Sequence, residues 1–266
     1  MPDGTTGRAL ITGASSGLGA AFAGLLSERG YEVILTGRDL VRLQSVAGSL
    51  PGPSRVVVAD LSRPAELATV EALLADTDAP VDLLVNNAAA GWHGPFAQHD
   101  PALLDETVAL NITAPIRLAR AVLPVMVARG RGGVINVSSV AGSSPSPRMA
   151  AYAATKSFVD SWTAAVTSEL RGTGVILTCV KPGYVRTDFH VRSGEAVDRV
   201  RDTDWMSPTY VAQRALDAHV RGRTSAVILP DVPPLQRLAR WSAGRARRAP
   251  WLRGTRAALR SVLRPG

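Results

Sequence analysis

The segment that decides the fold is Thr12-Gly13-Ala14-Ser15-Ser16-Gly17-Leu18-Gly19, between an apolar run at Arg8–Thr12 and a helix-like stretch at Leu18–Arg29. Gly13 can make the tight turn out of a strand, and Gly17 lets the backbone approach a phosphate. Gly19 lets the helix pack closely on the sheet, and the N–H groups at the helix start favour a pyrophosphate. The segment predicts a dinucleotide-binding strand, turn and helix, although a purely structural turn would use similar residues.

The remainder of the chain alternates short apolar runs with helix-like stretches, which is the pattern of βαβ units and a parallel sheet. The runs lack polar alternation, as expected of strands that helices cover on both faces. We expect strands at Arg8–Thr12, Glu32–Thr36, Arg55–Ala59, Leu83–Asn86, Val134–Ser138, Val175–Lys181 and Ala226–Leu229. We expect helices at Leu18–Arg29, Leu40–Ser49, Pro64–Ala75, Pro101–Arg129, Tyr152–Arg171 and Pro208–Arg221. The predicted fold is α/β, a doubly wound Rossmann-type parallel sheet of about seven strands with helices on both faces.

Length and composition bound the organisation of the chain. The 266 residues, 46% of them hydrophobic, suffice for one sizeable core, so we expect a single domain over residues 1–231, which includes the dinucleotide-binding turn. The single cysteine, Cys179, permits no intrachain disulfide, fits a cytoplasmic location and sits in an apolar run that predicts a buried thiol. Neither a secretory signal nor an apolar run of about 18 residues is visible. The mixed segment 188–206 breaks the alternation and is expected to act as a lid.

The net charge of +8 resides in the C-terminal tail, residues 232–266, which holds nine arginines and no acid. Within it Leu259, Val262 and Leu263 fall on one helical face with arginines beside them, a pattern that can lie on anionic membrane. The alternative is a helix docked on its own domain or on a second subunit. We expect no nucleic-acid binding, because the main domain offers no supporting basic surface.

The end of the second predicted strand selects between dinucleotides, because the adenosine ribose lies there. An acidic side chain would accept hydrogen bonds from a free 2′-hydroxyl, whereas arginine pairs with a 2′-phosphate. The strand ends Leu35-Thr36-Gly37-Arg38, with no acid before Asp39. Arg38, assisted by Ser15, therefore predicts NADP(H) in preference to NAD(H), with a solvated surface arginine as the alternative.

Four residues form a candidate catalytic set. Tyr152 and Lys156 are one helical turn apart and share a helix face, so the ammonium can lower the pKa of the phenol towards working pH. Ser139 follows the fifth predicted strand, where it could hold a carbonyl oxygen beside Tyr152. Asn111 interrupts a long helix-like stretch and could kink it and hold a water in a proton relay to Lys156. Each residue alone also has an ordinary structural interpretation.

Over about residues 5 to 230 the chain resembles a classical short-chain dehydrogenase/reductase. The residues that carry the resemblance are the Thr12–Gly19 turn, Asp60, Asn86-Asn87-Ala88-Ala89, Asn111, Ser139, Tyr152, Lys156 and Pro182-Gly183-Tyr184-Val185-Arg186-Thr187. The resemblance implies that Asn111, Ser139, Tyr152 and Lys156 form a catalytic tetrad. It also implies that Asp60 contacts adenine and that Val185 and Thr187 contact the nicotinamide carboxamide. Two departures are Ala89, where glycine is usual, and Lys181, which we expect at the surface.

With Arg38, the resemblance gives the cofactor-binding candidates. They are Gly13, Ser15, Ser16, Gly17, Leu18, Gly19, Arg38, Asp60, Leu61, Asn86, Asn87, Ala88, Tyr152, Lys156, Pro182, Gly183, Val185 and Thr187. Candidate substrate-pocket residues are Trp92, His93, Phe96, Pro145 to Met149, Tyr184, Phe189, His190, Trp205 and Met206, any of which could instead be packing residues. This apolar and aromatic set suits a hydrophobic ketone, aldehyde or secondary alcohol. We expect no metal.

The predicted function is NADPH-dependent reduction of a ketone or aldehyde, or oxidation of the matching secondary alcohol. A non-catalytic NADP-binding sensor or scaffold is one alternative, and an epimerase or dehydratase on the same fold is another. The complete set of Asn111, Ser139, Tyr152 and Lys156 argues against a mere binder. The resemblance further implies a homodimer or homotetramer, formed through the helices at Pro101–Arg129 and Tyr152–Arg171.

Overall fold

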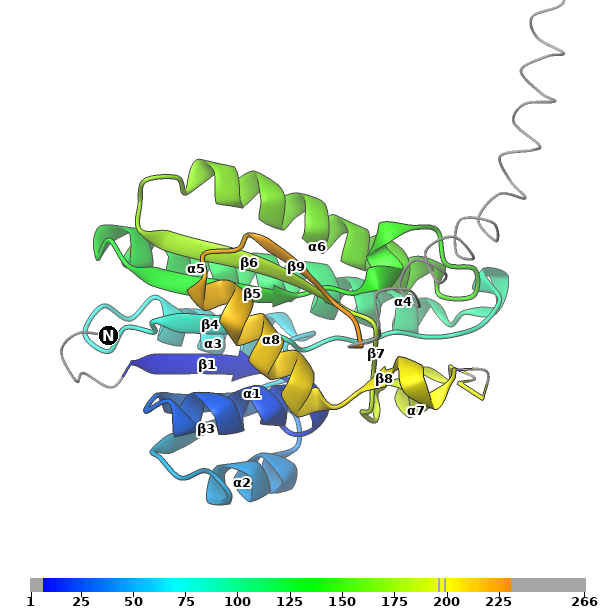
Figure 1. Ribbon diagram of the computed structural model, residues 1–266, viewed down its shortest axis with the longest axis horizontal. Coiled ribbons are helices and arrows are strands. Elements are labelled where there is room, and N and C mark those ends of the chain that lie inside the picture. Colours follow the sequence, from blue (N-terminus) through cyan, green and yellow to red (C-terminus); the bar gives the residue numbers. More distant parts are fainter. Residues whose placement is uncertain (1–6, 196, 199, 231–266) are drawn as a thin grey trace, which may run out of the picture. The chain divides into compact units, whose positions relative to one another are not determined.

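The protein is built around one seven-stranded sheet, seen in a computed structural model that describes residues 7–195, 197–198 and 200–230 (Figure 1). The strands follow the order β3-β2-β1-β4-β5-β6-β9, and every neighbouring pair is parallel. Their bounds are β1 Arg8–Thr12, β2 Glu32–Gly37, β3 Ser54–Val58, β4 Leu83–Asn86, β5 Gly132–Val137, β6 Val175–Pro182 and β9 Ser225–Ile228. The order reverses between β1 and β4, so the predicted doubly wound sheet is confirmed.

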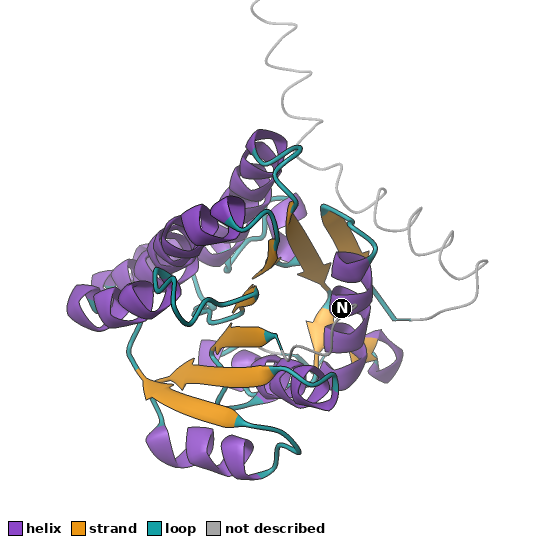
Figure 2. Cartoon of the chain, turned by 90° about the vertical axis from the view of Figure 1, so that its left-hand side faces the viewer, coloured by secondary structure: helices purple, strands orange, loops and turns teal. Residues whose placement is uncertain are grey.

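Helices cover both faces of this sheet (Figure 2). They are α1 Gly17–Glu28, α2 Leu40–Gly48, α3 Pro64–Leu74, α4 Pro101–Val108, α5 Ala114–Ala128, α6 Ala150–Glu169, α7 Phe189–Ser193 and α8 Pro208–Val220. Ser207 caps the start of α8, since its side chain accepts a hydrogen bond from the backbone N–H of Tyr210. Pro208 then occupies the first turn, where its missing N–H costs nothing.

Two buried cores explain why the strands are apolar on both sides. Ile11 and Leu35 pack into one core with Phe22 of α1 and Val211 of α8. The neighbouring residues of the same strands, Leu10 and Ile34, pack into the other core. That second core includes Leu67 and Val70 of α3, and Leu118, Val122 and Met126 of α5. Successive strand residues therefore both face helices, as the unbroken apolar runs predicted.

The predicted continuous helix at Pro101–Arg129 is wrong in its middle. A π-helical turn at Ala109–Thr113 separates α4 from α5. Asn111 lies in this turn, and its amide bonds the backbone of Ala90 in a neighbouring loop, which explains the local widening. The span 101–128 is long and apolar enough to cross a membrane by composition alone. In the fold, however, α5 buries its apolar face in the core beneath the sheet.

The segment expected to be a lid contains ordered elements. After β6 the chain forms β7 Tyr184–Val185, which pairs in parallel with β8 Trp205–Met206. Between these two short strands lie α7 and a single 3₁₀ turn, Asp202–Asp204. This small ladder holds the segment across the carboxyl end of β6. The Arg-rich tail predicted at 232–266 lies outside the described residues.

Candidate active site

A cavity of about 660 Å³ opens at the carboxyl ends of the parallel strands, where doubly wound sheets bind ligands. We call it the cleft. It brings together most of the residues predicted from sequence to bind a cofactor or to act in catalysis. Its wall includes Gly13, Ser15, Ser16, Gly17, Leu18, Arg38, Asp60, Leu61, Asn87, Ala88, Ser139, Tyr152, Lys156, Pro182, Gly183, Val185 and Thr187. Three predicted residues, Gly19, Asn86 and Asn111, lie behind this wall and support it.

The glycine turn has the backbone geometry that its sequence requires. Gly13 adopts a φ of +64°, a region that favours glycine. An added Cβ on Gly19 would collide with the carbonyl oxygen of Gly13, so a larger residue would push α1 away from the turn. Thr12 ties this turn to the end of β4, because its hydroxyl accepts from the backbone N–H groups of Asn87 and Ala88, both at 2.9 Å.

Asn86 is buried behind the wall of the cleft and does not line it. Its side-chain amide donates to the Asn136 side chain at 2.9 Å, and Asn136 donates to Thr163 Oγ1 of α6 at 2.9 Å. All three residues are buried, so each bond replaces one that water would otherwise make. This chain of hydrogen bonds holds β4, β5 and α6 in register below the cleft.

At the end of the cleft where we expect the adenosine to bind, called the adenosine end below, Arg38 is 61% exposed and meets two carboxylates. Its Nη1 donates to Glu106 Oε1 at 3.0 Å and lies 3.9 Å from Asp60 Oδ2. Burial opposes ionisation of Asp60, but the hydrogen bonds from Ser62 and the positive charges of Arg38 and Arg63 lower its pKa. Arg38 thus lies in the wall of the cleft, and a ligand that binds its guanidinium would have to compete with Glu106.

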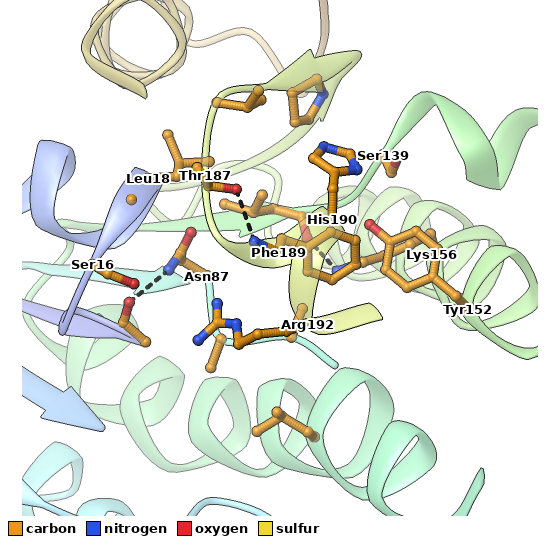
Figure 3. A pocket seen from close by; sticks show the side chains of 18 of the residues that line it. Ser16, Leu18, Asn87, Ser139, Tyr152, Lys156, Thr187, Phe189, His190 and Arg192 are labelled. Atoms are coloured by element: carbon orange, nitrogen blue, oxygen red, sulfur yellow. Dashed lines mark hydrogen bonds between the residues drawn. The ribbon is translucent and has the colours of Figure 1, made fainter. Parts of the chain in front are cut away.

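At the other end of the cleft, Tyr152 and Lys156 lie on one face of α6, as their spacing predicts (Figure 3). Lys156 Nζ lies 5.6 Å from the centre of the Tyr152 ring and donates to the Val137 carbonyl at 2.9 Å. Ser139, in the loop after β5, acts on the Tyr152 phenol from nearby. A phenol, a hydroxyl and an ammonium therefore converge at this end of the cleft.

The pKa of Tyr152 is raised, whereas the sequence led us to expect that Lys156 lowers it. Burial raises the pKa of Tyr152 to about 12, with the charge of Glu195 acting in the same direction and the Ser139 hydrogen bond against it. Burial also lowers the pKa of Lys156 to about 8. Without a cofactor, Tyr152 therefore keeps its proton at neutral pH and is poised as a proton donor.

Asn111 is fixed by three hydrogen bonds. Its Oδ1 accepts from the Ala90 N–H at 2.9 Å, and its Nδ2 donates to the Ala90 carbonyl at 2.8 Å and to Thr155 Oγ1 at 3.0 Å. Thr155 directly precedes Lys156 on α6. The amide thus joins the π-helical turn to α6, the helix that carries Tyr152 and Lys156, and its part in a proton relay stays a prediction.

The substrate end of the cleft holds only part of the predicted pocket. Tyr184, Phe189 and His190 line it, as do Ser146 and Met149 from the loop before α6. The Phe189 and Tyr152 rings lie 5.2 Å apart, so Phe189 covers the phenol. Within the described residues, the wall leaves out Trp92, His93, Phe96, Trp205 and Met206. Met206 is a core residue, and the Trp205 ring packs against His190 at 5.0 Å, so these two side chains support the site instead of lining it.

Besides Asp39 and Arg42 near the start of α2, sequence reasoning missed two charged wall residues in the lid segment, Arg192 of α7 and Glu195 just after it. Both fall in the mixed segment 188–206, where no periodicity indicated which side chains would face the site. The described part of the chain contains no cluster of three or more His, Cys, Asp or Glu side chains suited to a metal ion.

Comparison with known proteins agrees with this geometry. A profile of the short chain dehydrogenase family matches residues 8–198. A very-long-chain 3-oxoacyl-CoA reductase of Anas platyrhynchos is 32% identical over 204 residues, covering 72% of this chain and 64% of the relative.

Two solved structures also resemble the chain closely. A short-chain dehydrogenase from Sphingobium yanoikuyae, in complex with NADPH, has a TM-score of 0.79 and 34% identity, covering 98% of this chain and 97% of its own. A bulky-bulky ketone specific alcohol dehydrogenase from Comamonas testosteroni has a TM-score of 0.74 and 31% identity, covering 98% and 96%. The chain therefore belongs to the short-chain dehydrogenase family and is an oxidoreductase acting on CH–OH and C=O groups.

Proposed function

We propose that the protein uses NADPH to reduce a ketone or aldehyde, with Tyr152 giving the proton to the carbonyl oxygen. The observation that carries the proposal is the convergence of Tyr152, Ser139 and Lys156 in the cleft that also holds the glycine turn. Because the set is complete, we favour an enzyme over a sensor or scaffold. Tyr152 would donate a proton next to the place where the dinucleotide delivers a hydride, and this favours reduction over epimerisation or dehydration.

The residues present fit a dinucleotide. The cleft wall runs from Arg38 and Asp60, through the glycine turn, to Tyr152 and Lys156. The turn offers backbone N–H groups at the start of α1 to a pyrophosphate. When bound, the cofactor supplies the hydride that adds to the carbonyl carbon. Relatives solved with NADPH or NADP support the choice of dinucleotide.

The protein's own side chains supply the remaining chemistry. The Ser139 hydroxyl donates a hydrogen bond to the oxygen that carries developing negative charge. Tyr152, which is protonated at neutral pH, transfers its phenolic proton to that oxygen. Lys156 holds a positive charge beside the resulting phenolate and stabilises it. The Ala90 and Thr155 bonds of Asn111 keep α6, and with it both residues, in place.

We assign the preference for NADPH to Arg38, which reaches the adenosine end of the cleft and can pair with a 2′-phosphate.

Residues 1–231 would form the catalytic domain, with 188–206 as its lid. Exposed Val108 on α4 and Phe158 on α6 support a homo-oligomer formed through these helices. We place the protein in the cytoplasm, with peripheral membrane contact through the arginine-rich tail as a further proposal.

The test is NADPH oxidation with a panel of ketones and aldehydes by the full chain and by Tyr152→Phe. Removing the proposed proton donor should lower kcat at least about a hundredfold, the usual share of general acid catalysis. Tyr210→Phe is the matched control, because Tyr210 bonds the Leu229 carbonyl and lies away from the cleft wall. Undiminished turnover by Tyr152→Phe would refute the mechanism.

A further inference from the structure

A carboxylate lies among aromatic side chains at the substrate end of the cleft. Glu195 follows α7, and its side chain is 17% exposed. Its Oε2 lies 2.8 Å from His190 Nδ1, and its Oε1 accepts a hydrogen bond from the Tyr184 hydroxyl at 3.5 Å. His190 and Tyr184 line the same cleft. An acidic group is therefore built into the wall of the space where the substrate would lie.

The rings around Glu195 hold it in a defined position. His190 packs against Tyr184 with ring centres 5.4 Å apart and edge-on against Trp205 at 5.0 Å. Tyr184 also packs on Trp205 at 5.5 Å, and these two residues begin the paired strands β7 and β8. Because the side chains that bond Glu195 are themselves locked by packing, the carboxylate is preorganised to meet a ligand.

Glu195 is ionised at neutral pH and acts on the catalytic phenol. The His190 hydrogen bond, stronger in effect than the opposing burial, lowers the pKa of Glu195. Its charge adds to the effect of burial in raising the pKa of Tyr152. The carboxylate and the phenol therefore share one space, and a substrate bound against Tyr152 lies close to a negative charge.

An ionised carboxylate offers about four acceptor positions, and Glu195 uses two of them on His190 and Tyr184. A purely apolar substrate would displace water from the remaining positions without replacing its hydrogen bonds, which is unfavourable. A hydroxyl or ammonium group would replace them, whereas a second carboxylate would be repelled. The other charged lid residue, Arg192, is exposed and reaches into the cleft on the side of Asn87, away from Ser139 (Figure 3).

We infer that Glu195 determines substrate specificity, and that the substrate is a carbonyl compound with a hydrogen-bond donor, a hydroxyl or an ammonium, close to the reacting carbon. The inference rests on the proposed function and narrows its substrate class. It revises the expectation of a purely hydrophobic substrate, since Met149 and Phe189 accept the apolar part while Glu195 selects the polar one.

The test compares four aryl ketones of similar size that differ at one end. Butyrophenone carries a methyl group there, β-hydroxypropiophenone a hydroxyl, β-dimethylaminopropiophenone a protonated amine and β-benzoylpropionate a carboxylate. Binding to the full chain saturated with NADP, which cannot reduce the ketone, is measured by calorimetry, and turnover is measured separately as NADPH oxidation. We expect the hydroxyl or amine ketone to bind about tenfold or more tightly than butyrophenone, the effect of one charge-assisted hydrogen bond. Tighter binding of the amine ketone alone would identify a cationic substrate. Tighter binding of both the amine and the hydroxyl ketone would identify a site for hydrogen-bond donors in general.

The variant Glu195→Gln keeps the shape of the side chain and removes its charge. In this variant the affinity for the hydroxyl or amine ketone, divided by the affinity for butyrophenone, should fall close to one. Asp198→Asn is the matched control, because Asp198 is an exposed acid of the same segment outside the cleft wall, and it should keep the wild-type ratio. No preference in the wild type, or a preference that Glu195→Gln leaves intact, would overturn the inference. A donor preference in binding without any turnover would instead count against the proposed function alone.

Discussion

Lys181 of β6 forms an ion pair with Asp160 of α6, with Nζ and Oδ2 2.9 Å apart. Asp160 lies one helical turn beyond Lys156, and its other oxygen accepts a hydrogen bond from the Cys179 thiol at 3.2 Å. Burial raises the pKa of Cys179 to about 12, so the thiol is neutral, and the charge of Asp160 raises the pKa of Lys156. The ion pair therefore holds a negative charge close to the Lys156 ammonium.

We predict that Asp160→Asn shifts the pH dependence of turnover. Burial lowers the pKa of Lys156 to about 8, and the charge of Asp160 acts against that lowering. Tyr152, with a pKa of about 12, keeps its proton over this range, so Lys156 titrates first. Without the carboxylate, the ammonium should lose its proton earlier, and the fall of kcat at alkaline pH should move down by about one pH unit.

Lys181→Met is the control for this prediction, since it removes the partner of Asp160 but keeps the carboxylate. The alkaline limb of Lys181→Met should stay at or above the wild-type position, because the negative charge near Lys156 remains. Equal downward shifts in both variants would show that the ion pair acts only through packing, and Asp160 would then have no electrostatic role.

We predict that Arg38→Asp reverses the dinucleotide preference. The change removes the cation at the adenosine end of the cleft and places a carboxylate where a free 2′-hydroxyl can donate to it. NADPH binding should weaken by about tenfold to a hundredfold, as for the loss of a charge-assisted hydrogen bond, while NADH binding should improve. Titration of both dinucleotides measures this, and an unchanged Kd for NADPH would reject the role given to Arg38.

Glu106→Gln should act in the opposite direction. In the protein without cofactor, Arg38 donates to Glu106 at 3.0 Å, and this carboxylate competes with a 2′-phosphate for the guanidinium. Loss of its charge should tighten NADPH binding several-fold and leave NADH binding within about twofold, because the pair is largely exposed and screened. Weaker NADPH binding in this variant would mean that Glu106 orients Arg38 towards the ligand instead of competing for it.

The sequence was sufficient for the sheet and for placing Tyr152 and Lys156 together because both follow local rules. Unbroken apolar runs imply strands covered on two faces, and a spacing of four places Tyr152 and Lys156 on one side of a helix. The π-helical turn at Asn111 was anticipated only as a kink, since its cause is a bond to Ala90, distant in sequence. Lys181, expected at the surface, is 20% exposed because Asp160 faces it from α6.

The substrate end was poorly predicted for a related reason. Local patterns do not specify which residues of an irregular loop face a cleft. Trp205 and Met206 have the composition of pocket residues but pack behind the wall through the pairing of β7 with β8. Glu195 had no distinguishing spacing, and its position becomes evident only when His190 and Tyr184 are brought beside it by the fold.

The last prediction concerns stability and His219 of α8. Its Nδ1 lies 2.9 Å from Thr178 Oγ1, and that hydroxyl donates its own proton to the Arg223 carbonyl at 2.8 Å. The ring must therefore donate from Nδ1, and Nε2 packs over Gly133 of β5, where an added Cβ would collide with it. Burial lowers the pKa of His219 from 6.5 to about 4, so the folded protein holds the neutral ring.

This lowered pKa makes stability depend on pH with a defined sign. The unfolded chain takes up a proton near pH 6.5 and the folded protein only near pH 4, so unfolding is favoured as the pH falls through this window. The loss in the free energy of unfolding should reach about 3 kcal/mol at the acid end of this pH window. Urea unfolding between about pH 7 and pH 4 measures it, and His219→Asn, which keeps a donor for Thr178, should remove this part of the dependence. If both proteins lose stability in parallel over the window, other groups carry the dependence and the neutral His219 ring contributes nothing to it.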